Sequence, residues 1–579
     1  MTSHLTNTFD LIIVGGGIAG LTAGVRATEL GLKPVVLEQG EGVDYPNNSR
    51  QSGGILHIGF YDPFRPAPEL EKIIHQLTNG EAKPELTKAL ANNGARLITW
   101  LQDKGGKFMR FNPQEGYRWC MAPPRALKAG LDWKGRGPDL MIRRLAEELI
   151  ARGGVLQQGA RVTGLLMENG RCVGAQGTLQ DNPQIWNAPY CVIADGGFQA
   201  NRELYERYIG ADFESVFQRG ARTGRGDGLK MALSAGGSVT SGKRFYGHVL
   251  CSDALHNDNV WPYPEVDAIA TAGIVIDSSG QRIVDEGRSG VHLANQLASS
   301  SNTGKLFAVF DQTIWDGPGT SARIPANPLL EKAGGTILRA NTEEELAEKM
   351  GVPFTALINT INEYNVALSN NQLDTLSVPR SNKVKPMSIM NAPFMAIPIC
   401  PGITYTMVGI DIDEHAQVLD TEKKPILGLF AAGATTGGIE GGQDSVYIGG
   451  LIKSGSFGLI AAERIATLEG KSVSITSNQN SQRPEPHLSS AGNVDILAQK
   501  SLGLERFPIL RGTILYGKPI AIMLGFLCAL ICYALLLNPL GLWSVFIAIG
   551  VGLFIMVTLL GVVELVKLVT EFLIPHQDS

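Results

Sequence analysis

The sequence predicts an α/β protein whose doubly wound first domain is interrupted by an inserted α+β domain and followed by a C-terminal transmembrane helical hairpin. From Phe9 to Asn201, short apolar runs alternate with glycine turns and helical stretches, which is typical of a doubly wound domain. After an irregular middle region, the apolar segment "GLFAAGATTGG" and a further helical stretch return to this pattern. Two uncharged apolar segments of about 20 residues follow near the end of the chain.

The composition excludes some functional classes. At 579 residues the chain is long enough for two or three domains. Its net charge is -5, 18% of its residues are charged and no long basic run is present, so no nucleic-acid partner is expected. The seven cysteines are scattered without CxxC spacing, and therefore no metal, haem or iron–sulfur site is predicted.

The first glycine turn carries a dinucleotide fingerprint. In "FDLIIVGGGIAGLTAGVRATELGLKPVVLEQG", Gly15, Gly17 and Gly20 have GxGxxG spacing between an apolar strand and a helix, and Glu38 ends the next strand. Such glycines permit a tight turn and the close approach of a pyrophosphate, which the helix N-terminus favours. Glu38 is placed to accept a hydrogen bond from a ribose hydroxyl. The segment predicts a bound FAD or NAD.

Further glycine-rich segments favour FAD over a diffusible NAD. The loop "NNSRQSGGILHIGF" offers the hydroxyls of Ser49 and Ser52 and the backbone of Gly53 and Gly54 to a second phosphate or to an isoalloxazine edge. The segments "YCVIADGGFQAN" and "GLFAAGATTGG" each follow an apolar strand and bring backbone close to the same ligand. One elongated ligand contacted from four distant segments is more typical of FAD.

These patterns divide the chain into six expected segments. They are the first part of a Rossmann-like FAD-binding domain (1–235), an α+β capping or substrate domain (236–387), the second part of the FAD-binding domain (388–469), a polar linker (470–516), two transmembrane helices (517–566) and a cytoplasmic tail (567–579).

The C-terminal apolar segments predict a membrane anchor. Pro519–Leu537 and Leu542–Val563 are each long enough to cross a hydrocarbon core as a helix, and only "NPLG" separates them. Basic residues precede the first segment and Lys567 follows the second, which predicts that both ends face the cytoplasm. No signal peptide is apparent at the N-terminus. We therefore expect the protein on the cytoplasmic side of the inner membrane; a buried helical hairpin in a soluble domain is the alternative.

The order of motifs resembles a known family. "VGGGIAGLTA", "NSRQSGG", "VIADGGFQAN", "TGRGDG", "GQRIVDEG", "YTMVG", "LFAAGATTGG" and "GGLIKSGSFGLIAAE" together resemble the FAD-dependent fumarate reductase/succinate dehydrogenase flavoproteins over about Phe9 to Leu468. The segments "DEG" and "PGITYTMVGIDID" look most like the tricarballylate dehydrogenase branch. The resemblance implies that Asp227, Gly433 and Gly449 contact FAD. The flavin-linking histidine of the family falls near Asn47, which implies non-covalent FAD.

The resemblance also implies catalytic positions. An inserted domain of this family delivers an arginine to the substrate, and Arg288 in "QRIVDEGRSG" stands at that position. The resemblance implies that Arg288 shuttles a proton. Its chemistry favours a bidentate clamp on a substrate carboxylate, because a guanidinium rarely gives up a proton. A surface salt bridge with Asp285 or Glu286 is the third alternative.

Other positions depart from the family pattern. Tyr405 in "TYTMVG" and Tyr447 in "SVYIGG" replace a histidine and an arginine that hold a dicarboxylate in fumarate reductases. His248 matches another family histidine, and Glu265 substitutes for a carboxylate of the family's proton path. The two tyrosines also resemble those of ketosteroid dehydrogenases, whose phenols polarise a ketone and take a proton. Core packing of these side chains is the alternative.

Taken together, these features predict an FAD-dependent oxidoreductase that acts on a CH–CH bond of a small tricarballylate-like or fumarate/succinate-like carboxylate. Its second electron partner is expected to be a quinone or a membrane electron carrier, because no haem or iron–sulfur ligand set is visible in the chain. Two alternatives stay open: a ketosteroid-type dehydrogenase, and a non-catalytic flavin-binding membrane adaptor.

Overall fold

The computed structural model describes residues 9–111, 118–210, 212–300 and 304–473, with scattered helical positions between 522 and 560. The chain divides into two units, residues 1–108 with 115–485 and residues 109–114 with 486–579. Most of the expected linker, transmembrane segments and tail, 470–579, lies outside the described residues. Among the residues that are described, no helix combines the length and the apolar character needed to cross a membrane.

The main sheet of the first unit confirms the expected mixed α/β fold. Its strands run in the order β6-β2-β1-β10-β18-β8-β7, with β17 beside β18 and β9 beside β8. The strands β6, β2, β1, β10 and β18 are parallel neighbours. Their bounds are β1 (Leu11–Val14), β2 (Pro34–Glu38), β6 (Val155–Gln158), β7 (Ala160–Glu168), β8 (Arg171–Leu179), β9 (Asn182–Asn187), β10 (Cys191–Ile193), β17 (Gln417–Leu419) and β18 (Pro425–Ala431).

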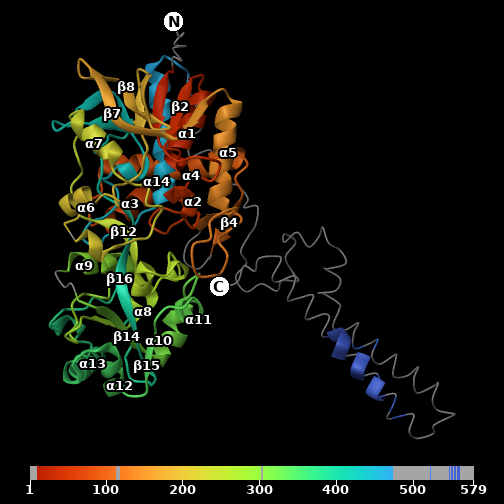
Figure 1. Ribbon diagram of the computed structural model, residues 1–579, viewed down its shortest axis with the longest axis vertical. Helices are drawn as coiled ribbons and strands as arrows, with labels where there is room; N and C mark the ends of the chain where they lie inside the picture. Colours follow the sequence, from red (N-terminus) through yellow and green to blue (C-terminus); the bar gives the residue numbers. More distant parts are fainter. Residues whose placement is uncertain are drawn as a thin grey trace. The chain divides into compact units, whose positions relative to one another are not determined.

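Helices cover this sheet because its central strands are largely apolar and are buried along their whole length. Every residue of β1 and β2 is buried, as expected for parallel strands packed on both faces. The helices α1 (Ile18–Glu29), α4 (Pro84–Asp103), α5 (Gly137–Ala151) and α14 (Gly450–Leu468) pack together beside it, α1 against α14 and α5, and α14 against α4 (Figure 1). Smaller elements of this part are α2 (Asn48–Gln51), β3 (Ile55–Leu56), α3 (Ala67–Leu77), β4 (Phe108–Phe111), β5 (Arg118–Met121), α6 (Arg202–Tyr208) and α7 (Asp227–Ser234).

A second, mixed sheet forms the core of the inserted domain, here called the cap. Its strands run β11-β16-β14-β13, and β12 and β15 also pair with β16. The strands are β11 (Phe217–Gln218), β12 (Phe245–Cys251), β13 (Ile274–Ile276), β14 (Leu306–Asp311), β15 (Leu338–Ala340) and β16 (Phe394–Thr406). The cap helices are α8 (Asp267–Ala272), α9 (Gly290–Ser299), α10 (Gln312–Asp316), α11 (Ala326–Lys332), α12 (Glu343–Met350) and α13 (Phe354–Ser369). Figure 1 shows these elements in green below the main sheet.

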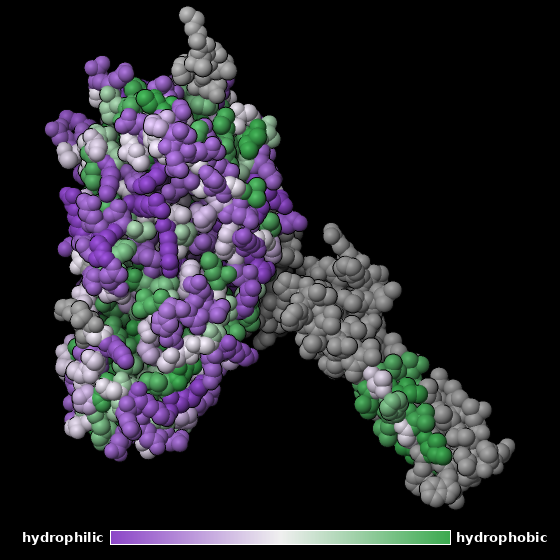
Figure 2. Space-filling model, in the orientation of Figure 1, coloured by the Kyte–Doolittle hydropathy of each residue, from purple (hydrophilic) through white to green (hydrophobic). Residues whose placement is uncertain are grey.

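The long strand β16 lies beyond the expected domain boundary at residue 388, yet its partners are cap strands. It pairs antiparallel with β12, β14 and β15 along most of its 13 residues. The buried run "FMAIPICPGITYT" belongs to the cap sheet because these partners supply its backbone hydrogen bonds. In Figure 2 the surface of the first unit is largely hydrophilic, with apolar residues in smaller areas between the polar ones.

Candidate active site

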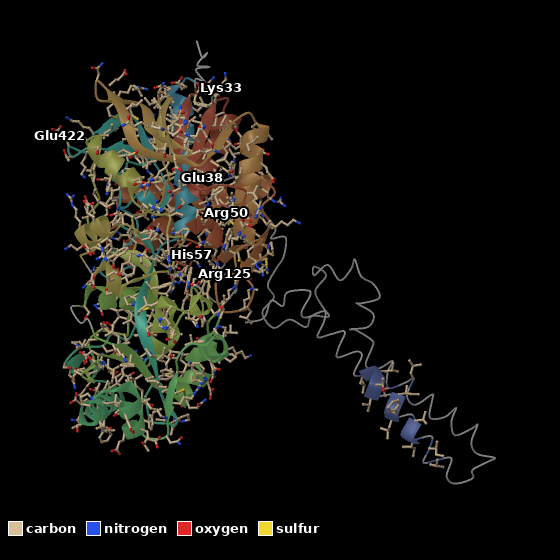
Figure 3. All side chains as sticks on the ribbon, viewed as in Figure 1. Lys33, Glu38, Arg50, His57, Arg125 and Glu422 are labelled. Carbon is tan, nitrogen blue, oxygen red and sulfur yellow. The ribbon has the colours of Figure 1, made fainter. Side chains whose placement is uncertain are left out.

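A cavity of about 270 Å³ opens along the carboxyl ends of the parallel strands and reaches the cap. Such a crevice is the usual ligand site of an open α/β sheet. In the view of Figure 3, Glu38, Arg50, His57 and Arg125 follow one another from the main sheet toward the cap. The cavity walls come from segments within 14–19, 37–60, 160–162, 194–199, 219–227 and 433–454, together with Tyr246, Pro262, Tyr263, Thr404 and Tyr405.

The glycine fingerprint forms the end of the cavity at the main sheet. Gly15 has a φ of 108°, and a Cβ on Gly20 would lie 1.9 Å from the Gly15 carbonyl oxygen, so both positions need glycine. Gly17 begins α1 without a side-chain cap. Glu38 accepts hydrogen bonds from the N–H groups of Gly16 and Gly40, both at 2.7 Å. Burial raises the pKa of Glu38, and these two hydrogen bonds partly offset that effect.

The second predicted loop also lines the cavity. Ser49, Ser52, Gly53 and Gly54 are all wall residues. The Ser49 hydroxyl accepts from the N–H of Ile18 at 3.1 Å, in the first turn of α1. The Ser52 hydroxyl donates to the Ser49 carbonyl at 2.8 Å and accepts from the Gly54 N–H at 3.2 Å. These bonds hold the loop beside the glycine turn.

The remaining expected cofactor positions divide into two groups. Asp227 and Gly433 line the cavity, and Asp227 also pairs with Arg161 at 2.9 Å. Gly20 and Gly449 are absent from the wall and instead allow close packing. A Cβ on Gly449, whose φ is 149°, would lie 2.2 Å from the carbonyl oxygen of His57.

The wall residues fit an elongated, polar dinucleotide such as FAD. Two buried acceptors in the wall, the Oε1 atoms of Gln51 and Gln199, have no hydrogen-bond partner among the described residues. Buried polar atoms are nearly always paired, so these atoms indicate a polar ligand. A Cβ on Gly196 would meet nothing within 4 Å, and one on Gly17 would meet only the Ser49 hydroxyl at 3.4 Å. The backbone here therefore leaves open space for that ligand.

The end of the cavity beside the cap is lined by aromatic side chains. The rings of Tyr246 and Tyr447 stack with centroids 4.0 Å apart, and Tyr405 lies 5.4 Å from Tyr246. His57 stacks on Phe60 at 4.6 Å and meets the Tyr447 ring edge to face at 5.2 Å. The cavity therefore joins a phosphate-binding turn at one end to a cluster of phenol and imidazole rings at the other.

A buried ion pair holds Tyr405 in this cluster. Glu440 and Lys453 are 0% and 2% exposed, and Lys453 Nζ lies 2.6 Å from Glu440 Oε2. The Tyr405 hydroxyl donates to the Glu440 carboxylate at 3.0 Å. Glu440 Oε1 also accepts from the N–H groups of Ile448 and Gly449. The Tyr405 hydroxyl proton is therefore used in the hydrogen bond to Glu440. The sequence analysis did not identify Glu440 as a site residue. The available signal was its partner, the single lysine in the apolar helix "GGLIKSGSFGLIAAE".

Tyr447 is placed differently. Its hydroxyl oxygen accepts from the N–H of Gly450 at 3.0 Å, at the start of α14. Within the described part of the chain, no acceptor is found for the Tyr447 proton. Burial raises the pKa of Tyr246, Tyr405 and Tyr447, so all three phenols keep their protons at neutral pH. Tyr447 can therefore donate a hydrogen bond into the cavity.

Two buried guanidinium groups flank Tyr263 on the cap side, and sequence reasoning identified neither. Arg219 lines the cavity and pairs with Glu265, with its carbon Cζ 5.0 Å from the Tyr263 ring centroid. Arg125, 6% exposed, lies 4.9 Å from the same ring and donates to the carbonyls of Gln51 and Ser52. Its Nε and Nη1 atoms are buried, and the part of the chain that the structure describes offers them no hydrogen-bond partner. Both groups carry positive charge near this wall.

His248 lies behind the aromatic cluster. Its Nδ1 atom is 2.5 Å from Asp267 Oδ2, and its Nε2 atom is 3.0 Å from the Tyr246 hydroxyl. His248 is not a wall residue, whereas Tyr246 is. The expected stand-in carboxylate, Glu265, lies 3.5 Å from the same Nε2 atom. His248 is therefore connected to the cavity indirectly, through its hydrogen bond to Tyr246.

The structure does not bring Arg288 into the cavity. Its guanidinium donates to Asp285 at 3.1 Å and to Asp444 at 2.5 Å, and its side chain is 25% exposed. Glu286 pairs instead with Arg282 at 2.6 Å. Of the three alternatives for Arg288, this arrangement matches the salt bridge with Asp285, because carboxylates on both sides satisfy the group. Among the described residues, no cluster of three or more His, Cys, Asp or Glu side chains is arranged to hold a metal ion.

Comparisons with known proteins agree with this geometry. The FAD binding domain family matches residues 10–446. The chain is 27% identical over 545 residues to an NADH:acrylate oxidoreductase of Vibrio harveyi, covering 80% of this chain and 51% of that protein. It is 23% identical over 452 residues to an NADH:fumarate oxidoreductase of Klebsiella pneumoniae, covering 75% and 45%. The chain thus spans about half the length of these relatives.

A likeness of fold extends to solved structures. The 3-ketosteroid Δ1-dehydrogenase from Sterolibacterium denitrificans superposes with a TM-score of 0.65 at 18% identity, covering 80% of this chain and 100% of that chain. At this identity the match shows a shared fold.

Proposed function

Since the chain belongs to the FAD-binding family of fumarate reductase and succinate dehydrogenase flavoproteins, and its cofactor is FAD, we propose that it is an oxidoreductase acting on a CH–CH bond next to a carboxylate or carbonyl group. When bound, FAD takes or supplies a hydride at one carbon of that bond. The protein must then move a proton at the neighbouring carbon and stabilise negative charge on the adjacent oxygen.

The observation that carries this proposal is the group of neutral phenols at one end of the cavity. Tyr447 has a proton to donate, and its oxygen is fixed by the Gly450 N–H. A donor held in this way stabilises charge that develops on a carbonyl or carboxylate oxygen. Tyr246 stacks on Tyr447 and carries a second proton close by.

The positive charge beside Tyr263 supports a small carboxylate as the substrate. Arg219 has a carboxylate partner in Glu265, whereas no carboxylate lies within salt-bridge distance of Arg125 among the described residues. A buried guanidinium without a counter-ion favours an anion nearby. Substrates of the acrylate, fumarate or tricarballylate type carry such an anion. We therefore propose a small carboxylate as the substrate, attracted by Arg219 in the cavity wall and by the charge of Arg125, which lies outside the wall beside Tyr263.

A ring ketone is the second candidate. The stacked rings of Tyr246, Tyr447, His57 and Phe60 offer flat apolar surface, and the Tyr447 donor suits a ketone oxygen as well as a carboxylate. The shared fold with a ketosteroid dehydrogenase is compatible with this candidate.

We further propose that electrons are exchanged with a quinone or another membrane electron carrier at the cytoplasmic face of the inner membrane. The support comes from the two apolar segments within 517–566. The test is fractionation of the full chain beside a variant ending at residue 473. Recovery of the full chain in the soluble fraction at high salt, without detergent, contradicts the membrane proposal.

Anaerobic flavin titration tests the reaction and separates the two substrate candidates. The oxidised and the photoreduced proteins are mixed with acrylate, fumarate, tricarballylate and 1,4-androstadiene-3,17-dione, and the flavin absorbance is followed. We expect Arg125→Met to weaken carboxylate binding by about tenfold, or about 1.4 kcal/mol, because the variant lacks a buried positive charge close to the cavity. Binding of the neutral steroid is expected to be unchanged. Arg136→Met, which removes a partly exposed arginine paired with Asp132, serves as the control.

Unaltered carboxylate binding by Arg125→Met with full FAD content contradicts the carboxylate assignment. A flavin that changes its redox state with no compound of this set contradicts the proposed function itself.

A further inference from the structure

We propose that Tyr246, His248 and Asp267 form a proton relay that delivers a proton to the substrate carbon in place of an arginine. The inference rests on the proposed function, since it concerns the proton that accompanies hydride transfer. Tyr246 is the catalytic residue of the relay because it lines the cavity, and His248 and Asp267 act through it.

The contacts define a continuous path. Tyr246 and His248 lie two residues apart on β12, so both side chains project from the same face of the strand. The Tyr246 hydroxyl meets His248 Nε2 at 3.0 Å, and His248 Nδ1 meets Asp267 Oδ2 at 2.5 Å. Asp267 begins α8, and its other oxygen accepts from the Val249 N–H at 2.7 Å. The carboxylate is held in place and keeps a proton on Nδ1 of His248.

The relay can be refilled from water. The side chains of His248 and Asp267 are 14% and 22% exposed, and the ring of Tyr246 lies against those of Tyr405 and Tyr447. Two carboxylates face the histidine, since Glu265 Oε1 lies 3.5 Å from Nε2 and Asp267 Oδ2 lies 2.5 Å from Nδ1. The other charged or titratable groups that face Tyr246 are Arg219, Tyr263, Tyr405 and Tyr447.

In the reducing direction the step balances as follows. With FAD bound in its reduced form, the cofactor would supply a hydride to one carbon of the C=C bond, and the electron pair would move to the neighbouring carbon and its carbonyl group. That carbon takes the Tyr246 proton, so a C–H bond forms as the O–H bond breaks. The phenolate then takes the Nε2 proton of His248, which becomes neutral and keeps its Nδ1 proton toward Asp267. Water restores the proton to His248. The oxidising direction runs the same steps in reverse.

Neither Tyr405 nor Tyr447 can replace Tyr246 in this role. The Tyr405 proton is donated to Glu440. The Tyr447 oxygen accepts from a backbone N–H, and a backbone amide has no proton to pass on. Of these three phenols, Tyr246 is the one joined to a titratable imidazole.

The test is stopped-flow reoxidation of the photoreduced holoprotein by acrylate and by fumarate between pH 5.5 and pH 9. We expect Tyr246→Phe and His248→Asn each to slow reoxidation by about 10²–10⁴-fold, the usual contribution of a positioned acid. The double variant is expected to be no slower than Tyr246→Phe alone, because residues that act in series are not additive. Added imidazole should restore part of the rate to His248→Ala. His256→Asn is the control, since His256 is 73% exposed and also lies near an aspartate.

FAD content and the spectral change on substrate binding are measured in every variant, so loss of folding is separated from loss of proton transfer. The relay is refuted if His248→Asn keeps the rate and pH profile of the wild type. It is also refuted if the two substitutions slow the reaction multiplicatively. If the reduced wild-type protein is reoxidised by neither compound, the relay and the proposed function are both refuted. If the wild type is reoxidised and His248→Asn is reoxidised at the same rate, the relay alone is refuted.

Discussion

Replacing Lys453 by Met is expected to destabilise the protein strongly, because it leaves the Glu440 carboxylate buried without a counter-ion. Both groups are almost completely buried, and their charged atoms lie 2.6 Å apart. Removing one partner of a buried ion pair costs about 3–5 kcal/mol, which corresponds to a change of roughly 10²–10³ or more in the unfolding equilibrium. The remaining donors to Glu440 are the Tyr405 hydroxyl and two backbone N–H groups, and these are neutral.

The assay is urea unfolding of the holoprotein, followed by release of flavin fluorescence. Lys453→Met, Glu440→Gln and the double variant complete a mutant cycle, and we expect the double variant to be more stable than Lys453→Met, because neither charge then remains. Lys424→Met is the control, since Lys424 and its partner Glu422 are 72% and 71% exposed. Additive losses in the double variant, or a Lys453→Met midpoint equal to that of the control, would refute the reasoning.

Three further predictions concern other parts of the molecule. Gly20→Ala should purify with little bound FAD, because its Cβ would overlap a carbonyl oxygen of the glycine turn; normal flavin absorbance contradicts this. Arg288→Ala should lower turnover by less than about tenfold, since this group lies outside the cavity, and a loss of about 10³-fold would restore its shuttle role. Burial, with the charge of Arg288 nearby, lowers the pKa of His292 to about 4. A histidine with a lowered folded pKa stabilises the protein at neutral pH, and this contribution is lost as the pH falls from about 6.5 to about 4. Between pH 7 and pH 4, His292→Leu should therefore lose about 3 kcal/mol less stability than wild type in urea unfolding, with the exposed His256→Leu as control.

The parts of the fold that could be predicted from the sequence are those set by local pattern. The turn containing Gly15, Gly17 and Gly20 was recognisable because its glycines, strand and helix follow one another within 30 residues. The domain to which β16 belongs was harder to predict. The residues of β16 are as apolar as those of a main-sheet strand, and its pairing with the earlier strands β12, β14 and β15 places it in the cap.

The site residues that could be predicted from the sequence are likewise those marked by a local motif. Tyr405 and Tyr447 were predicted from their motifs, and the structure brings both to the cavity. Arg288 was expected there because of its position in a motif, but its partner Asp444 is 156 residues away and leaves no local signal. Arg219 and Glu440 were missed for a related reason. Arg219 is buried by residues distant in sequence, such as Glu265. Glu440 lies in a loop, where no regular spacing of apolar residues marks a buried position.

The strand β16 passes from the interior of the cap to the wall of the cavity, with one irregularity in its pairing to β12 at Thr404. Its first residues are clamped by β14 and β15, and Thr404 and Tyr405 stand at its far end. Because cap strands hold β16 along most of its length, a displacement of the cap sheet would carry Thr404 and Tyr405 with it and so would alter the hydrogen bond between Tyr405 and Glu440.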